Sequence, residues 1–320
     1  MRPAHRIITG GLLVTLTVTG LILFHLHKQR TPERPVIYIA TPSPRLEILP
    51  VYLGIASGHF DEAGLRVCVL NTGAGGRQKP GMLIACNMED VLYSHIFHGE
   101  DHVVVSTLTK HEYALLLSRE PEPFAWEKTK GKSIITAVPT SSTTAILEAV
   151  LRENGVYPHR EAVLIQNLPE KLRIPLFIAG TGDYIVAPEP AATVLTRSRK
   201  AFLAAPLSKG KPLYLIVLAA PENWAGKNRA VLTAFTRALA PAQAELYDRP
   251  AAEIAWTLGA YFPQVSLCTL EAAIARGQRE KVWDSGRKPN PAHFHRLQEI
   301  LKRSGELPCA ISYEEVFWGQ

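Results

Sequence analysis

The sequence predicts an α/β protein built as two lobes. Short apolar runs of strand length alternate with segments of helical periodicity along most of the chain, and this alternation is typical of parallel sheets joined by helical crossovers. The pattern breaks at a proline-rich turn, residues 120–123, and starts again after Trp126. A chain of 320 residues is long enough for two units that each bury a hydrophobic core.

The first unit opens with a strand and an amphipathic helix. Leu49, Leu53 and Ala56 recur at helical spacing, and Gly58 follows the helix as a natural stop. A glycine-rich loop, residues 71–76, comes after the second strand. The predicted order is strand 35–40, helix 46–57, strand 66–70, a helical piece at 82–84, and strands at 91–96, 102–107 and 113–118.

The second unit repeats the alternation. A run of hydroxyl residues precedes a helix that Gly155 ends, and Glu189 lies between two prolines after a short strand. The predicted order is strand 132–138, helix 144–154, strand 163–165, a helix or turn at 172–179, strand 183–187, helix 191–196, a returning strand 212–219 and a mostly helical tail 227–302.

Two crossings, near residues 118–124 and 206–213, join the units in this arrangement. Residues 36–120 and 214–320 are therefore assigned to the first lobe, and residues 121–213 to the second. Two lobes joined by such crossings form a hinge, so we expect a ligand to bind in the cleft between them.

The charge of the chain is concentrated near its N-terminus. The composition, 47% hydrophobic and 20% charged, excludes disordered, collagen-like and coiled-coil proteins. The net charge is +6, but residues 1–35 contain one acid, Glu33, against five basic residues: Arg2, Arg6, Lys28, Arg30 and Arg34. Residues 36–320 therefore carry only about +2, and we expect no nucleic-acid partner.

Residues 1–28 are predicted to contain a membrane-spanning helix. No charged residue occurs from Ile7 to Phe24. As a helix, these 18 residues, or 21 if the uncharged run is followed to His27, span roughly 27–31 Å, which is enough to cross the hydrocarbon core of a bilayer. Arg2 and Arg6 precede it, as in a secretory leader.

The end of this apolar segment favours an anchor that is not removed. Residues 21–28, LILFHLHK, offer no pair of small residues to a signal peptidase and no cysteine for lipidation. We therefore favour a single-pass anchor over a cleaved signal peptide. Residues 29–35 would then be a linker to an extracytoplasmic globular part at the cell membrane.

Sequence motifs of catalysis are missing. The chain has no G-x-S-x-G elbow, no H-E-x-x-H pair, no P-loop and no G-x-G-x-x-G. Residues 73–76 with Arg77 and Lys79 are a weak candidate for a phosphate cradle, and we favour a flexible loop there. We expect no enzymatic activity and no cofactor.

The histidines do not form a convincing metal site. His95, His98 and His102 would share one face of a continuous helix, but residues 99–101 interrupt it. We therefore favour surface histidines over metal ligands.

The four cysteines, Cys68, Cys86, Cys268 and Cys309, form no C-x-x-C pair. Small buried thiols are favoured over a disulfide between Cys68 and Cys86.

Polar residues at strand and helix ends are the candidates for ligand contacts. Thr140, Ser141 and Ser142 belong to a run of hydroxyl residues just before the helix 144–154. One hydroxyl is expected to cap this helix, and the others, with the free N–H groups of its first turn, would suit an anion or a polar group. Ser43 and Glu189 follow strands, at the edge where open α/β sheets bind ligands.

Several motifs in this order resemble one family of binding proteins. Residues 49–67 contain LPVYLGIA, GHF and EAGLRV, which resemble the family opening P-x-x-x-A-x-x-x-G-x-F-x-x-x-G-L-x-V. Residues 182–190, GDYIVAPEP, resemble its G-x-D-A-x-x-x-x-E-P. The likeness covers about residues 36–318 and is to the sulfonate, nitrate, taurine and pyrimidine (thiamine-precursor) binding proteins of ABC importers.

The resemblance implies a type II periplasmic-binding-protein fold that delivers a cleft ligand to a membrane permease. It places Ser43, Asn71, Thr72 and Glu189 around the cleft, together with the turn 140–142. It also places Ser94 and Asp90 where the family has its G-x-D. Here the chain departs from the family, because residues 86–89, CNME, stand where S-G-x-x-D is usual.

The ligand class and the biological role stay open at this stage. Hydroxyl groups with Arg45 would suit a small oxyanion, whereas Glu189 with Tyr93 or Trp126 would suit an aromatic ring bearing an amine. A ligand-sensing ectodomain is an alternative that a permanent anchor would suit. A pyrimidine-synthesising enzyme of the same fold is disfavoured because its cysteine-rich stretch is absent.

Overall fold

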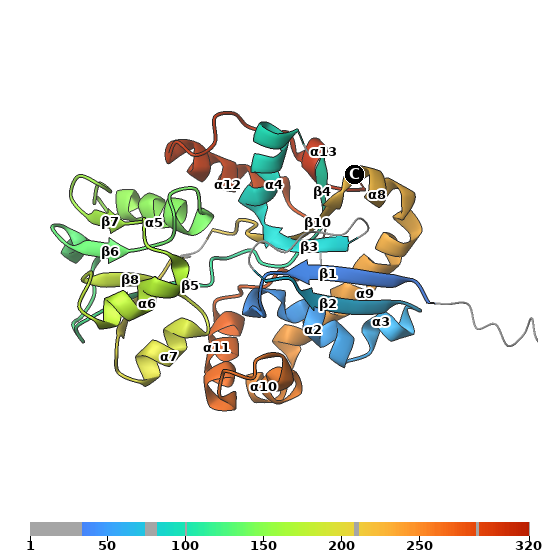
Figure 1. The fold of residues 1–320 in the computed structure, drawn as a ribbon, viewed down its shortest axis with the longest axis horizontal. Coiled ribbons are helices and arrows are strands. Elements are labelled where there is room, and N and C mark those ends of the chain that lie inside the picture. The colour runs from blue at the N-terminus through green and yellow to red at the C-terminus, as the bar shows by residue number, and fades with distance from the viewer. Residues whose placement is uncertain (1–33, 74–81, 100, 208–210, 286–287, 320) are drawn as a thin grey trace, which may run out of the picture. The chain divides into compact units, whose positions relative to one another are not determined.

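Two five-stranded sheets organise the chain from Val36 onward (Figure 1). In the computed structural model the chain divides into residues 1–35 and residues 36–320. The structure describes residues 34–73, 82–99, 101–207, 211–285 and 288–319. The predicted membrane segment, Ile7–Phe24, lies outside these ranges. Within them, no helix has the length and apolar character needed to cross a membrane.

The first sheet has the strand order β2-β1-β3-β10-β4. Its strands are β1 (Val36–Thr41), β2 (Arg66–Asn71), β3 (Met82–Asn87), β4 (His102–Thr107) and β10 (Ile216–Pro221). β1 is parallel to β2 and β3, while β10 runs antiparallel to β3 and β4. Ile37 and Ile39 on β1, which lies between β2 and β3, are fully buried, as expected for β-branched residues inside a covered sheet.

The second sheet has the order β7-β6-β8-β5-β9. Its strands are β5 (Ala114–Ser118), β6 (Ser133–Ile135), β7 (Val163–Ile165), β8 (Tyr184–Pro188) and β9 (Phe202–Pro206). β6 is parallel to β7 and β8, and β5 runs antiparallel to β8 and β9. Both sheets therefore mix parallel and antiparallel pairs, with one returning strand in each.

The structure corrects the boundary between the lobes. The strand at residues 113–118 was assigned to the first lobe, but β5 lies in the second sheet. The chain thus crosses at residues 108–113, before β5, and returns at residues 207–215, after β9. Apolar periodicity identifies a strand without specifying the sheet to which it belongs, because hydrogen-bond partners are non-local. The second sheet also contains β9, which the sequence analysis did not identify.

Two short apolar segments were given the wrong secondary structure. The helical piece at 82–84 is part of strand β3, and the strand at 91–96 is the helix α4 (Met88–Tyr93) with a π-turn at Ser94–His98. Periodicity alone cannot separate strand from helix in runs this short. The deciding signal for α4 is local, because the Asp90 carboxylate accepts hydrogen bonds from the backbone and side-chain N–H groups of Asn87.

Helices cover the sheets and link them (Figure 1). α2 and α3 pack against α9, and α10 packs against α11. Two C-terminal helices reach the helices of the second sheet, because α12 contacts α5 and α11 contacts α7. The remaining helices are α2 (Leu49–Ala56), α3 (His59–Glu62), α5 (Ser142–Glu153), α6 (Glu170–Ile178), α7 (Ala191–Arg197), α8 (Glu222–Lys227), α9 (Arg229–Asp248), α10 (Ala251–Leu258), α11 (Leu267–Arg279), α12 (Pro291–Arg303) and α13 (Tyr313–Val316).

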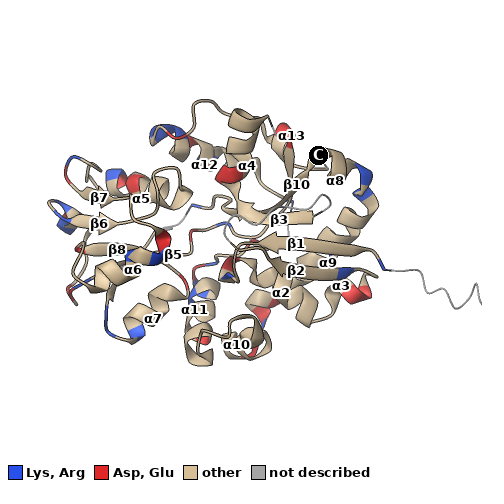
Figure 2. Cartoon of the chain, in the orientation of Figure 1, with Lys and Arg blue, Asp and Glu red and all other residues tan. Residues whose placement is uncertain are grey.

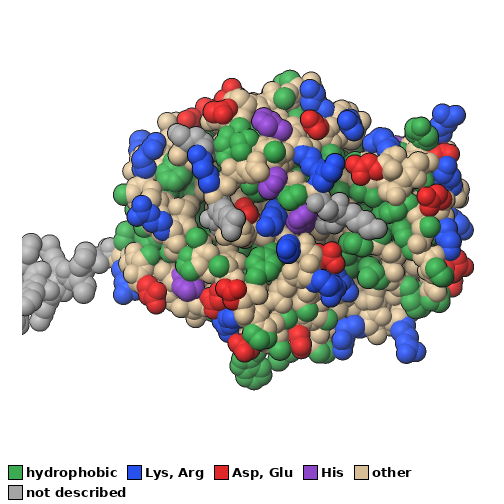
Figure 3. Space-filling view, turned by 180° about the vertical axis from the view of Figure 1, so that it is seen from behind, with side chains coloured by type: hydrophobic (Ala, Val, Ile, Leu, Met, Phe, Trp, Pro, Cys, Tyr) green, Lys and Arg blue, Asp and Glu red, His purple; other side chains and the backbone are tan. Residues whose placement is uncertain are grey.

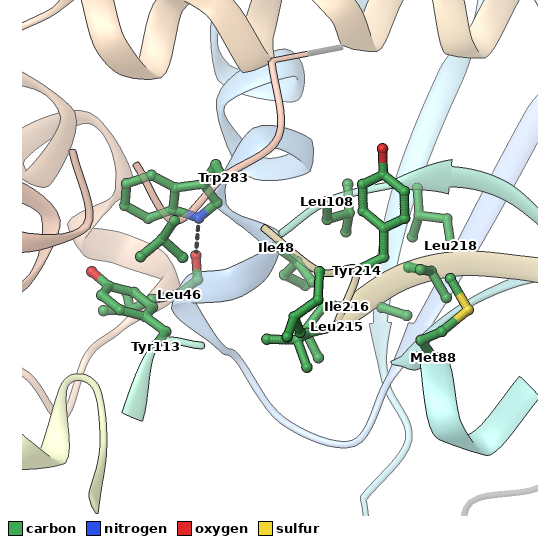
Figure 4. Packing of buried hydrophobic residues seen from close by; sticks show 14 of the residues in the cluster. Leu46, Ile48, Met88, Leu108, Tyr113, Tyr214, Leu215, Ile216, Leu218 and Trp283 are labelled. Carbon is green, nitrogen blue, oxygen red and sulfur yellow. Dashed lines mark hydrogen bonds between the residues drawn. The ribbon is translucent and has the colours of Figure 1, made fainter. Parts of the chain in front are cut away.

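A fully buried tryptophan packs beside the first crossing (Figure 4). The indole N–H of Trp283 donates to the carbonyl of Leu46 at 2.9 Å, and its ring meets the ring of Tyr113 edge-on at 5.5 Å. The Tyr113 hydroxyl in turn donates to the carbonyl of Ala273 in α11. Gly277, one turn further along α11, leaves room for both rings, since a Cβ there would lie 2.7 Å from the Tyr113 hydroxyl oxygen. The crossing is thus held by close packing that requires glycine.

The substitution Gly277→Ala is expected to destabilise the protein by about 1–3 kcal/mol, because the added methyl group overlaps the Trp283 ring and the Tyr113 hydroxyl. Gly226→Ala is the matched control, since a Cβ there meets nothing within 4 Å, and it should be neutral or stabilising by up to about 1 kcal/mol. Urea unfolding of both variants measures the difference. Equal stability of the two would contradict the packing described.

Candidate functional site

A cleft of about 520 Å³ lies between the two sheets and is lined from both sides. The first lobe contributes the loop after β1 and helix α4, and the second contributes the loop after β6, helix α6 and the end of β8. Residues at and beside the two crossings also line it: Thr109, His111, Glu112, Tyr113, Ala114, Leu215 and Ile216. Ligand clefts in proteins have this size and position, at the carboxyl ends of strands.

Six of the predicted site residues line this cleft. They are Ser43, Arg45, Thr140, Ser141, Ser142 and Glu189. The other three, Asn71, Thr72 and Ser94, are not among the described residues that line it. The backbone N–H of Thr72, just after β2, instead donates a hydrogen bond to the carbonyl of Thr41 at 3.0 Å. The Ser94 hydroxyl donates to the carbonyl of Val91 at 2.8 Å.

Glu189 is already engaged by the protein itself. Its carboxylate is buried and accepts hydrogen bonds from the backbone N–H and the hydroxyl of Thr193 at 3.0 and 2.9 Å. The same carboxylate forms an ion pair with Arg276 of α11. Glu189 therefore ties α11 to the second sheet, and this role requires no ligand.

Arg45, the cation that would suit an oxyanion, also has protein partners. Its guanidinium group forms an ion pair with Glu47 at 3.1 Å. Burial acts to lower the pKa of Arg45, but the charges of Glu47, Glu112 and Glu89 together outweigh burial, so the pKa lies above its ordinary value. Arg45 thus compensates carboxylates of the cleft.

The amino end of α5 is capped differently from the prediction. Ser141 occupies the N-cap position, but its hydroxyl makes no capping hydrogen bond. Instead, the backbone N–H of Ser142 donates to Glu89 Oε1 of α4 at 2.9 Å, and the Thr143 hydroxyl donates to Glu112 at 2.9 Å. A carboxylate from the first lobe therefore occupies the position at the helix N-terminus where anions bind best.

Glu89 is a buried ionisable group in the lining of the cleft. The residue is 2% exposed, and Oε2 of its carboxylate has no hydrogen-bond partner among the described residues. Burial, followed by the charge of Asp90, raises the pKa of Glu89 to about 7, despite the hydrogen bond from Ser142. A perturbed carboxyl group in a cleft is a typical mark of a functional site.

Other contacts also join the lobes near Glu89. The Tyr93 hydroxyl donates to the carbonyl of Thr140 at 3.0 Å. Burial raises the pKa of Tyr93, so its phenol remains a donor at neutral pH. His111 on the first crossing is neutral, because burial and the nearby Lys110 lower its pKa to about 4.

Acidic groups outnumber basic ones in the cleft. Among its described lining residues, six are acidic and two are arginines: Glu47, Glu89, Asp90, Glu112, Glu170 and Glu189, with Arg45 and Arg173. Figure 2 shows acidic positions on α4 and in the segments between the sheets. On the outer face seen in Figure 3, by contrast, acidic and basic side chains are intermixed. The acidic character therefore belongs to the cleft.

Sequence reasoning did not select most of these carboxylates. Glu47, Glu112 and Glu170 carry no motif of their own, and only the fold brings them together. Glu89 did leave a signal, because the segment CNME at residues 86–89 departs from the family pattern. That departure places a carboxyl group where it meets α5.

The histidine and cysteine candidates lie outside the cleft lining that the structure describes. The ring of His95 donates from Nε2 to the carbonyl of His102 at 2.6 Å. No three metal-ligating side chains converge anywhere in the described ranges. All four cysteines are free, with Cys68 and Cys86 half-buried and Cys268 and Cys309 exposed. Burial raises the pKa of the Cys86 thiol, which keeps it protonated.

Comparison with known proteins identifies relatives of the whole fold. A family model described as NMT1/THI5 like matches residues 45–253. "Putative binding protein YtlA" of Bacillus subtilis (strain 168) is 26% identical over 277 residues, which cover 83% of each chain.

Solved structures share the two-sheet architecture. The periplasmic aliphatic sulphonate binding protein SsuA of Escherichia coli matches with a TM-score of 0.66 at 14% identity, over 90% of this chain and 98% of that one. The desulfurization enzyme DSZB matches with a TM-score of 0.65 at 14% identity, over 89% and 96%. The predicted periplasmic-binding-protein fold is thereby confirmed, and the second match shows that an enzyme can use it.

The pKa of Glu89 predicts how stability depends on pH. The folded protein holds the Glu89 proton up to about pH 7, whereas the unfolded chain releases it near pH 4.5, so this residue's contribution to stability is lost as pH rises through that window. Glu89→Gln keeps the acceptor for Ser142 and should be more stable than the wild type at pH 8 by on the order of 1–3 kcal/mol.

The measurement is urea unfolding of the full, unliganded chain in mild detergent between pH 5 and pH 8. The advantage of Glu89→Gln should shrink towards pH 5. Glu271→Gln, an exposed carboxyl group on α11, is the matched control and should show no such trend. A difference between Glu89→Gln and the wild type that does not vary with pH would contradict the assignment.

Proposed function

The chain belongs to the NMT1/THI5-like family, and we propose that it is a solute-binding protein that captures a small polar ligand for an ABC importer. The observation that carries this proposal is the cleft of about 520 Å³, lined by polar side chains from both lobes. Binding energy comes from a few fixed polar groups, and no bond is made or broken.

Hinge closure is the physical basis of the proposed capture. The lobes are joined by two crossing segments, residues 108–113 and 207–215, and meet again at α4 and α5. The Glu89 and Tyr93 contacts form only when the amino end of α5 lies close to α4. A ligand that bridges both walls stabilises this closed form, and a permease can then recognise it.

The proposed location is the outer side of the cell membrane. The uncharged segment Ile7–Phe24, preceded by Arg2 and Arg6, supports a single-pass anchor with the globular part extracytoplasmic. The E. coli protein of the same fold is periplasmic. A permanent anchor also suits a ligand-sensing ectodomain, which is the second candidate function.

An enzymatic role receives less support from the cleft. None of its described lining residues is a cysteine, and His111 is held neutral by burial. No hydrogen bond between a histidine and a serine or threonine hydroxyl occurs in the part of the cleft lining that the structure describes. We therefore propose binding without chemistry, in contrast to DSZB.

The test asks whether the cleft carries a ligand in the cell. The full chain is purified from its native membranes, denatured, and the released small molecules are identified by mass spectrometry. Ser141→Trp should abolish the bound compound, because Ser141 lines the cleft, is only partly buried and makes no capping bond that the change would remove.

Ser198→Trp, at an exposed position beyond α7, is the matched control and should retain the compound. Equal recovery of every small molecule from the wild type and Ser141→Trp would overturn the proposal. Co-purification of a permease, rather than of a kinase or cyclase, separates transport from sensing.

A further inference from the structure

The amino end of α5 has its anion position filled by the protein. In a helix of 12 residues, the first N–H groups form the natural receptor for a sulfonate or nitrate oxygen. Here the carboxylate of Glu89 accepts the N–H of Ser142 at 2.9 Å. An oxyanion entering the cleft would have to displace a buried carboxylate and would then lie beside it, with like charges close together.

The second oxygen of Glu89 indicates what the cleft accepts instead. Glu89 lines the cleft and is 2% exposed, and Oε2 has no hydrogen-bond donor among the described residues. A buried carboxylate oxygen without a donor costs free energy, which an incoming N–H group would recover. Among the described residues, Oε2 of Glu89 is therefore an acceptor without a donor.

The charged residues near Glu89 also favour a cationic ligand. Asp90 is adjacent on α4, and Glu112 lies on the first crossing with hydrogen bonds from Tyr113, Ala114 and Thr143. Arg45 is paired with Glu47, and its charge also reaches Glu112 and Glu89. Arg173, the other guanidinium group of the lining, donates from Nε to the carbonyl of Leu168 at 3.2 Å.

We propose that the cleft selects a small organic cation, with a protonated amine or amidinium group held by Glu89 and supported by Asp90 and Glu112, and that it discriminates against oxyanions. This inference rests on the proposed binding function and specifies its ligand class. It separates this chain from SsuA, whose ligand is a sulphonate. A metal ion is a weaker occupant, because the described residues bring no three metal ligands together.

The test measures the thermal unfolding of the full chain in mild detergent at pH 8, where Glu89 is ionised. The probes are methylguanidinium, benzylammonium, methanesulfonate and nitrate at equal millimolar concentration, with sodium chloride to match ionic strength. At least one organic cation should raise the unfolding temperature by about 2 °C or more, and neither anion should do so.

Three variants assign the effect to Glu89. Glu89→Gln keeps the acceptor for Ser142 but should lose most of the cation-induced rise in unfolding temperature. Glu271→Gln, at an exposed position of α11, should retain that rise. Glu89→Ser uncovers the amino end of α5 and should gain a shift with methanesulfonate. This gain is a result that mere damage to the fold would not produce.

Each contrary outcome has its own meaning. A methanesulfonate or nitrate shift in the wild type overturns the charge selectivity and leaves the binding function standing. A cation shift that Glu89→Gln retains in full overturns the role of Glu89. The inference also fails if a zinc or magnesium shift that a chelator reverses exceeds that of the organic cations, or if no probe shifts the wild type. The mass-spectrometric experiment tests the binding function separately in every case.

Discussion

The contact between Glu89 of α4 and the amino end of α5 fixes how the two lobes face each other. One carboxylate oxygen accepts the N–H of Ser142 at 2.9 Å, and the Tyr93 hydroxyl reaches the carbonyl of Thr140 beside it. Both contacts join a helix of the first lobe to the entrance of a helix in the second. On the other side, the ion pair between Arg276 and Glu189 joins α11 to the second sheet. The cleft lies between these two connections.

The same contact gives the cleft its chemical character. A carboxyl group placed at a helix N-terminus removes an anion site and leaves one buried oxygen without a donor. The pKa of Glu89 is raised because desolvation of the carboxylate outweighs its favourable hydrogen bond at the helix end. Functional sites commonly retain such strain, since a group that is fully satisfied by the protein has little left to offer a ligand.

The relation to solved structures illustrates how far a fold constrains function. The chain shares its architecture with a sulphonate-binding protein and with a desulfurization enzyme, at 14% identity in both cases. One architecture can serve different roles because function depends on the site that a fold carries and not on the fold itself. In this chain those positions carry six carboxylates in the described lining. The charge at the cleft is therefore a feature of this chain that the shared fold does not determine.

Much of the architecture was predictable from local sequence. The strands at 102–107 and 163–165 and the helices that begin near residues 142 and 191 follow from periodicity, glycine stops and prolines, all of which act between near neighbours. The hydroxyl run at 140–142, which was expected to contact a ligand because it lies between a strand and a helix, lines the cleft, and a ligand contact there stays a prediction.

Tertiary structure alone decided which partner each group met. Strand β5 belongs to the second sheet. The amino end of α5 is capped by Glu89 and not by the Ser141 hydroxyl. Glu189 forms an ion pair with Arg276, which is 87 positions away in the sequence. These outcomes depend on contacts between residues far apart in the chain, and burial determines how strongly the charged groups interact there. The sequence by itself determined a two-lobed α/β binding fold. The folded chain determined the sign of the charge in its cleft, because that sign is a sum over side chains that only folding brings together.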